Sequence, residues 1–294
     1  MVAEAKVKSW ERFGEELDTD YHTANKVFWQ TVRRLRDRRD GSLRVLKDKQ
    51  GHILTDEKAI VERWAEYFEE LLNPISASPP WPELHSRAKT NLDVDEVWRA
   101  VKRLKSAKSA GVDEIRPEML KALGGAGFVW LTRVFQAAWD SGEAPEDWQL
   151  GVVVPLFKKG DRADCNNYRG ISLLSVPGKV YAKVLESRVR AVVEPNLSDE
   201  QCGFRPGRST TDQSFTLQQV VEKSWEYARP LFMCFVDLEK AYDRVPRNLM
   251  WECLVEYGVD DELVRAVTSL YKDCKACVRA NGVKSRSFTV GTGL

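Results

Sequence analysis

One acidic residue of this sequence stands where an oxygen ligand for a metal ion could be held. Asp237 follows the apolar run 231–234, and this pattern predicts a buried strand that ends at or near the carboxylate. A buried carboxylate without a partner is costly, but together with the neighbouring main-chain carbonyl of Leu238 it is a partial ligand shell for Mg²⁺. The same pattern also fits a cap of the following turn, so the residue types alone leave both interpretations open.

Three loops upstream of Asp237 place Arg or Lys next to Gly or Pro. They cover residues 105–111, 158–169 and 205–208. Small residues let a backbone approach a phosphate closely, and Arg offers it two parallel N–H groups. The three loops therefore favour a surface for a nucleic acid or a nucleoside triphosphate. The basic run 33–49 fits either a solvated face or a phosphate-facing patch.

Other kinds of catalytic centre have little support in the sequence. The three histidines, His22, His52 and His85, all precede the Gly-rich loops and the cysteines, so a His-based nucleophilic triad is not indicated. Cys274 and Cys277 lack a second Cys or His pair at zinc-like spacing and are expected to be free thiols. The sequence contains no P-loop and no dinucleotide-binding fingerprint.

The composition is that of an ordinary globular protein. The sequence has 294 residues, of which 43% are hydrophobic and 30% charged, with a net charge of +1. No signal peptide and no membrane-spanning run can be recognised. We therefore expect an intracellular protein, in the nucleus or the cytoplasm, whose six cysteines are reduced.

Hydrophobic periodicity predicts an α+β architecture, in which helices alternate with a few strands. A Pro-rich linker over 73–83 separates a helical N-terminal segment from the rest. Pro155 predicts that the strand 150–157 is an edge strand or carries a bulge, and Asn281-Gly282 predicts a hairpin over 277–290. Helices are expected over 60–71, 93–104, 116–123, 128–140, 180–193, 215–226, 247–257 and 262–272.

Four blocks together resemble a known family. The stretches KSAGVDEIRPEML, VVVPLFKKGDRADCNNYRGISLL, QCGFRPGRSTTDQ and FVDLEKAYDRV occur in this order and are similar to the reverse transcriptases of non-LTR (LINE-type) retrotransposons. The resemblance implies a right-hand polymerase with fingers and a partial palm, preceded by a helical N-terminal extension. It also suggests three parts: a helical connector over 1–72, a linker and lead-in over 73–94, and fingers with an incomplete palm over 95–294.

The resemblance also implies roles for individual residues. Such enzymes are RNA-directed DNA polymerases that use Mg²⁺, an RNA template, a DNA primer and deoxynucleoside triphosphates. The residues that match the motifs are Asp237 as a catalytic metal ligand, Leu238 as a carbonyl ligand, Arg169 and Tyr242 at the nucleotide, and Arg205 and Arg208 along the template. Gly170 stands where the family often has a Pro.

The motif pattern stops before the second catalytic element of the family, a hairpin with two adjacent aspartates. The sequence ends FTVGTGL, and Asp260-Asp261 is better explained as the start of a helix. We therefore expect a polymerase fragment, truncated within the palm and inactive alone, whose hairpin over 277–290 lacks sheet neighbours. The alternative is a non-catalytic remnant that binds RNA or DNA.

Overall fold

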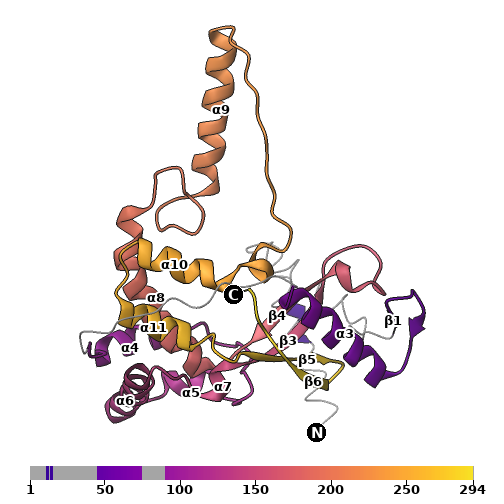
Figure 1. The fold of residues 1–294 in the computed structure, drawn as a ribbon, viewed down its shortest axis with the longest axis vertical. Coiled ribbons are helices and arrows are strands. Elements are labelled where there is room, and N and C mark those ends of the chain that lie inside the picture. The colour runs from indigo at the N-terminus through magenta and orange to yellow at the C-terminus, as the bar shows by residue number, and fades with distance from the viewer. Residues whose placement is uncertain (1–10, 13, 16–44, 75–89, 294) are drawn as a thin grey trace. The chain divides into compact units, whose positions relative to one another are not determined.

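The computed structural model describes residues 11–12, 14–15, 45–74 and 90–293. Most of the basic run 33–49 and of the linker 73–83 lies outside the described residues. The chain divides into two compact units, Met1–Arg44 and Val45–Leu294, and the elements below belong to the second (Figure 1). In the described part of the chain, no helix is both long and apolar enough to cross a membrane.

The second unit mixes helices with a small sheet, which confirms the expected α+β class. Its strands are β1 (Leu46–Lys47), β2 (Ile53–Leu54), β3 (Leu150–Phe157), β4 (Tyr168–Leu173), β5 (Lys275–Ala280) and β6 (Val283–Thr289). Its α-helices are α3 (Glu57–Leu72), α4 (Val94–Lys102), α5 (Pro117–Lys121), α6 (Gly125–Ser141), α7 (Glu146–Gln149), α8 (Val176–Val193), α9 (Thr210–Glu226), α10 (Arg247–Glu256) and α11 (Asp261–Ser269). Short 3₁₀ turns are η1 (Cys165–Asn167), η2 (Glu194–Asn196) and η3 (Ala241–Arg244).

A four-stranded sheet with the order β4-β3-β5-β6 forms the centre of the site region. β3 is antiparallel to β4 over its length but pairs in parallel with β5 only from Leu150 to Val153. The prediction of an edge strand is therefore wrong for the first half of β3. Pro155, which has no N–H to donate, lies in the second half, where β4 is the only strand of the described residues that pairs with β3.

The hairpin at the end of the chain is formed as predicted, but its expected isolation is wrong. Asn281 and Gly282 both have positive φ, 51° and 82°, which is the backbone that a type I′ turn requires. The hairpin does not lack neighbours, because β5 pairs with β3. A segment more than 100 residues upstream in the sequence thus completes the sheet.

Helix α3 packs across one face of the sheet, with contacts to β5 and β6 and to Tyr168 on β4. Ile60, Trp64 and Phe68 recur at helical spacing and are all buried, as the periodicity predicted. The ring of Trp64 meets that of Tyr168 on β4 edge-on at 4.8 Å. The proposed division of the chain at residues 72 and 94 stays a prediction, and residues 57–72 are packed on the sheet.

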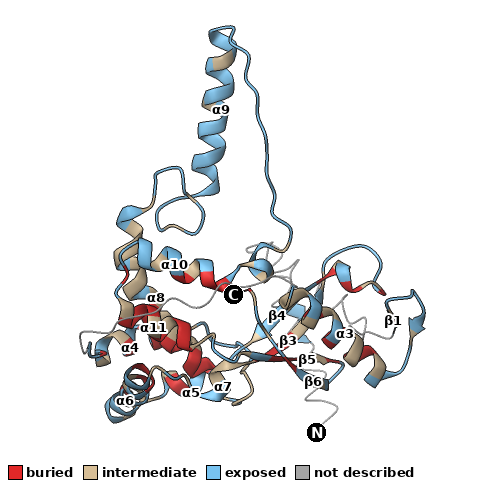
Figure 2. Ribbon diagram, viewed as in Figure 1, coloured by how far each residue is buried: buried red, intermediate tan, exposed pale blue. Residues whose placement is uncertain are grey.

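A second hydrophobic core lies among helices α4, α6, α8, α10 and α11, seen as the red segments in Figure 2. Phe135, Tyr181 and Trp251 are fully buried at its centre. Helix α4 begins with the predicted capping box. The Asp93 side chain accepts a hydrogen bond from the backbone of the first turn, and the Glu96 side chain accepts one from the backbone N–H of Asp93. This core fixes the β4–α8 junction, where the fully buried Ser175 caps α8.

The predicted buried strand that ends at Asp237 is wrong. Residues 230–238 form no strand and every one of them is exposed, and Phe232 retains 91% of its accessible surface. The reason is the absence of a partner, since a strand needs a neighbour for its backbone N–H and C=O groups, and the sheet pairs only β4, β3, β5 and β6. Together with α9, in which no residue is buried, this segment projects from the rest of the unit (Figure 1). We call residues 209–238 the arm.

Candidate nucleotide and nucleic-acid site

Arg169, the predicted nucleotide contact, stands on a well-supported strand. It lies on β4 opposite Leu156 of β3 and is exposed, and its guanidinium makes no ion pair or hydrogen bond with the described part of the chain. Its neighbour Gly170 lies on the other face, where a Cβ atom would approach the ring of Phe68 to 2.7 Å. The glycine thus lets α3 pack closely on the sheet, and this packing holds the strand that presents Arg169.

Asp237 and Leu238, the predicted metal ligands, lie at the end of the exposed arm. Asp237 is exposed, and among the described residues its carboxylate has no hydrogen-bond or ion-pair partner. Leu238 keeps 70% of its side-chain surface. The interpretation of Asp237 as a turn cap is therefore not supported either. The carboxylate is available to a ligand, but the structure brings no second acidic group to it.

Tyr242 is the one predicted nucleotide residue that contacts a cationic loop. It is half exposed, and its ring meets that of Phe204 edge-on at 6.0 Å. Phe204 directly precedes Arg205 in the loop 203–208 and has a left-handed backbone with φ 61°. Sequence patterns could not predict this contact, because the two rings are 38 positions apart in the sequence, one on the turn η3 and the other in a loop.

Arg205 and Arg208, the predicted template residues, differ in how far they are engaged. Arg205 is largely buried and binds Glu194 at 2.9 Å and the Ser198 carbonyl at 2.7 Å, so its guanidinium holds the loop onto the end of α8. Arg208 is more exposed and pairs with Asp199 at 2.7 Å. Their contact with a template stays a prediction, and Arg208 is the freer of the two.

Arg247 is a structural residue that the sequence reasoning missed. It is buried at the start of α10, and its guanidinium donates to the carbonyls of Gly293 at 2.9 Å and Val290 at 2.7 Å. On the other side, Asn73 donates to the carbonyl of Thr289 at 2.8 Å. These bonds tie the end of β6 and the residues that follow it, 289–293, to α10 and to the end of α3. An Arg at a helix start after Pro246 was the only signal for this in the sequence.

The six cysteines differ in how far they are buried. All six cysteines are free, and Cys165 and Cys277 are buried. Burial raises the pKa of Cys165 to about 11, so this thiol is protonated at neutral pH. Cys234, on the arm, is exposed. None of the described residues forms a cluster of three or more His, Cys, Asp or Glu side chains that could hold a metal ion.

The described residues do not assemble a complete metal site. Asp237 and the carbonyl of Leu238 offer hard oxygen atoms of the kind that Mg²⁺ prefers. One carboxylate and one carbonyl from a single exposed segment are too few to fix the ion, and no cluster of acidic residues supplements them in the part of the chain that is described. We therefore derive no chemical step through a metal ion from this structure.

The chain is similar to proteins of transposable elements. Residues 157–294 match the family model described as Reverse transcriptase (RNA-dependent DNA polymerase). The chain is 25% identical, over 95% of its length, to the Transposon TX1 uncharacterized 149 kDa protein of Xenopus laevis. It is 31% identical, over 88% of its length, to the Putative 115 kDa protein in type-1 retrotransposable element R1DM of Drosophila melanogaster.

A third relative is the Probable RNA-directed DNA polymerase from transposon BS of Drosophila melanogaster, 27% identical over 64% of the chain. The chain spans only 22%, 24% and 20% of these three relatives, in the order given. It corresponds to about a quarter or less of each. Residues 157–294 thus resemble a reverse transcriptase domain, and the chain as a whole is similar to part of the RNA-directed DNA polymerases of non-LTR retrotransposons.

Proposed function

We propose that this chain supplies the fingers and part of the palm of an RNA-directed DNA polymerase, and that it binds an RNA template and a DNA primer. The match of residues 157–294 to the reverse transcriptase family carries this proposal. All the predicted site residues lie within the matched range: Arg169, Arg205, Arg208, Asp237, Leu238 and Tyr242. The sheet β4-β3-β5-β6 then belongs to the fingers.

In this proposal Arg169 binds the triphosphate of the incoming deoxynucleotide. Its exposed position on β4 and its lack of a partner among the described residues leave the whole guanidinium available to phosphate oxygens. Tyr242 lies against the sugar, and its contact with Phe204 limits the positions that its ring can take. A substitution of Arg169 should therefore weaken triphosphate binding without unfolding the sheet.

Polymerases of this family use divalent metal ions, which align a primer hydroxyl with the incoming nucleotide and stabilise the charge of the phosphates. We assign one carboxylate ligand, Asp237, and one carbonyl ligand, Leu238, to such an ion. The other acidic ligands would have to meet Asp237 from elsewhere, because the described residues contain no acidic cluster around it.

We propose further that the 294-residue polypeptide by itself does not polymerise DNA. A metal centre with one carboxylate instead of three compensates the phosphate charges poorly. The loss of several kcal/mol of transition-state stabilisation corresponds to a rate decrease of roughly a thousandfold or more. A primer-extension assay with Mg²⁺ or Mn²⁺ tests this, with Asp237→Asn as the matched control. Template-dependent incorporation by the wild type, abolished in the control, would refute the predicted inactivity.

The second candidate function is nucleic-acid binding without catalysis. The exposed and unpartnered position of Asp237 favours it, because binding through cationic loops requires no assembled metal centre. Both candidate functions require binding of a nucleic acid. Fluorescence anisotropy with a labelled RNA–DNA primer–template measures the affinity of this binding. We expect the affinity to fall steeply between about 50 and 200 mM salt as phosphate contacts are lost. Binding that is absent, or unchanged over this range, would contradict both candidates.

A further inference from the structure

A cavity on the sheet is lined by cations that the assignments above do not use. It has a volume of about 750 Å³. Four basic side chains line it, Lys108 and Arg116 from the 105–116 loop and Arg279 and Lys284 from the β5–β6 hairpin, together with Glu114 and Glu118. The two segments are more than 160 residues apart in the sequence, so the fold alone brings these charges together.

The two hairpin cations stand directly opposite each other. Arg279 on β5 and Lys284 on β6 are cross-strand partners, whose Cβ atoms lie about 5 Å apart in such a pair. Like charges in this position destabilise a sheet. Neither residue forms an ion pair with the described part of the chain. The hairpin therefore carries a repulsion that an anion bound between the two side chains would relieve.

The acidic residues of the lining do not cancel these charges. The carboxylate of Glu118 already accepts a hydrogen bond of 2.6 Å from the backbone N–H of Ala107 and so holds the loop itself. Glu114 and Glu118 together place two carboxylates against four cations, so the lining keeps a net positive charge. Both Ala107 and Glu114 have positive φ, 57° and 56°, which is costly for residues other than glycine. The loop is thus held in a strained backbone at the cavity wall.

A glycine contact fixes this loop against the rest of the domain. At Gly111 a Cβ atom would lie 2.5 Å from the backbone of Leu174 and Ser175, at the junction of β4 and α8. No side chain fits there without moving the backbone. The loop therefore rests directly on the junction that follows the strand of Arg169, and this contact supports Lys108 and Arg116.

We propose that this cavity binds the sugar–phosphate backbone of single-stranded RNA. The proposal rests on the function proposed above, because the RNA is the template of that activity. None of the described residues that line the cavity is aromatic, so it lacks the ring surfaces on which bases stack. Phosphate contacts without base contacts position a strand but do not read its sequence. The site therefore holds RNA of any sequence.

The double variant Arg279→Gln/Lys284→Gln tests the site in the full 294-residue chain. For single-stranded RNA the slope of log affinity against log salt is about 0.7 per phosphate contact. We expect the variant to reduce this slope by about 1.4, equally for oligo(U) and oligo(A). The matched control is Lys58→Gln/Lys272→Gln, which removes two exposed charges away from the cavity and should leave the slope unchanged.

The single variant Lys284→Glu separates binding from folding. Glu at this position would face Arg279, so we expect a higher melting temperature together with weaker RNA binding. A purely structural role for Lys284 would move both quantities in the same direction. A Lys284→Glu protein that melts higher and binds RNA as tightly as the wild type would overturn the proposal.

Further outcomes distinguish RNA binding in this cavity from RNA binding elsewhere on the chain, and from binding of a free polyphosphate in the cavity. If the wild type binds RNA and the double variant shows the same salt slope, the cavity assignment fails and the proposed function stands. If the wild type binds no RNA, the proposed function itself fails. Inorganic triphosphate added at equal phosphate concentration should not displace the RNA, and displacement would assign the cavity to a free polyphosphate instead.

Discussion

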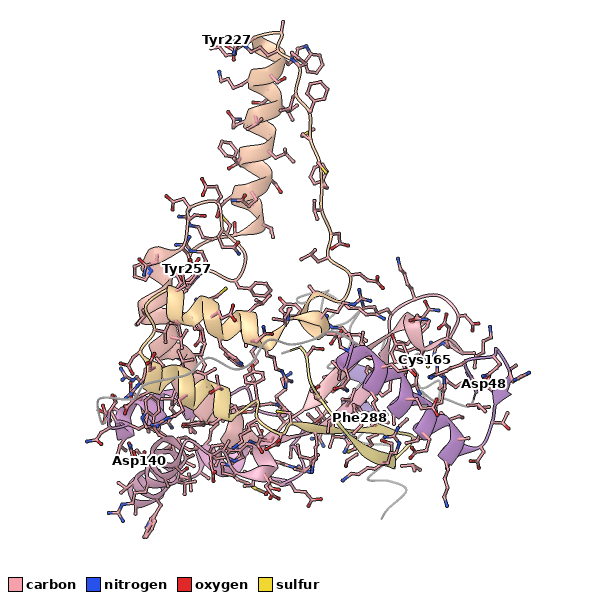
Figure 3. All side chains as sticks on the ribbon, in the orientation of Figure 1. Asp48, Asp140, Cys165, Tyr227, Tyr257 and Phe288 are labelled. Atoms are coloured by element: carbon pink, nitrogen blue, oxygen red, sulfur yellow. The ribbon has the colours of Figure 1, made fainter. Side chains whose placement is uncertain are left out.

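Strand β4 and the arm carry the two halves of the candidate active site, and they are supported in different ways. β4, with Arg169, is paired with β3 along its length and packed beneath α3. The arm, with Asp237 at its end, has no buried residue in α9 and none in 230–238. Figure 3 shows the side chains of the arm standing free, up to Tyr227 at its far end.

This difference shows which site residues are held in place by packing among the described residues. The nucleotide side depends on packing that is complete among the described residues. The metal side lies on a segment whose apolar side chains, such as Phe232 and Val236, are exposed to water. Full burial of such a side chain would stabilise the fold by about 1.5–3 kcal/mol, and the arm lacks this contribution. The described fold therefore stabilises the position of Arg169 and leaves that of Asp237 to other contacts.

The largest expected effect is a difference in the free energy of unfolding between a substitution in the packed region and one in the arm. Trp64→Ala removes a fully buried indole beneath the sheet and should lower the free energy of unfolding by about 3–5 kcal/mol. Phe232→Ala is the matched control in the arm and should change it by less than about 0.5 kcal/mol. Urea unfolding measures both. A large loss in Phe232→Ala would show that the arm is packed in solution and would break the comparison.

Thiol reactivity tests the same contrast without a change in packing. Cys234 on the arm is exposed and Cys165 beneath α3 is buried. With a pKa of about 11, Cys165 has a thiolate fraction of roughly one in a thousand at pH 8. We expect iodoacetamide to modify Cys234 at least about a hundredfold faster than Cys165, as followed by peptide mass spectrometry. Equal protection of the two thiols would show that residues 231–237 form a covered strand after all.

The packing beneath Arg169 can be tested at Gly170. In Gly170→Ala the new methyl group would lie 2.7 Å from Phe68 and 3.0 Å from Val153, so the variant should be destabilised by about 1–3 kcal/mol. The control is Gly203→Ala in an open loop, where the nearest heavy atom would be 3.5 Å away. Urea unfolding of both variants is the measurement. A Gly170→Ala protein as stable as the control would mean that α3 does not press on β4.

The smallest effect compares two capping boxes. Burial alone would raise the pKa of Glu96, but hydrogen bonds from Arg188 and from the Asp93 N–H outweigh it, so this pKa lies below its ordinary value. The resulting stabilisation is complete above the unfolded-state pKa of about 4.3 and is lost as the pH falls through the lower folded-state pKa.

Glu96→Gln should therefore cost about 1 kcal/mol at pH 7 and flatten the loss of stability below about pH 5. The counterpart in the arm is Asp212→Asn, which removes the corresponding carboxylate charge from the capping box of α9. This variant should leave global unfolding unchanged, because α9 contributes no buried residue to either core. Unfolding curves between pH 3 and 7 measure both variants. A similar loss in Asp212→Asn would indicate that the arm unfolds together with the body.

The local features of the fold could be predicted because neighbouring residues determine them. The apolar spacing of α3, the Asp93–Glu96 capping box, the cap at Asp260 and the Asn281-Gly282 turn are all found in the structure. The predicted strand before Asp237 failed because strand pairing is a long-range property. An apolar run of this kind is equally compatible with a ladder and with an exposed, extended backbone.

The candidate site could be predicted only as a set of residue types. The motifs pointed to Arg169, Tyr242 and Asp237, but not to the contact of Tyr242 with Phe204. Nor did they distinguish Arg205, whose guanidinium holds its own loop, from the freer Arg208. The engagement of a side chain depends on neighbours that are distant in the sequence.

By itself, the sequence determined the reverse transcriptase motifs, the helix caps and the hairpin turn, because each depends on residues that are close together along the chain. Only the tertiary structure decided that β5 joins β3 across more than 100 residues, that four cations line one cavity at this sheet, and that the Asp237 carboxylate has no hydrogen-bond or ion-pair partner among the described residues. The physical reason is that strand pairing and charge clustering depend on which distant segments the packed helices and strands bring together.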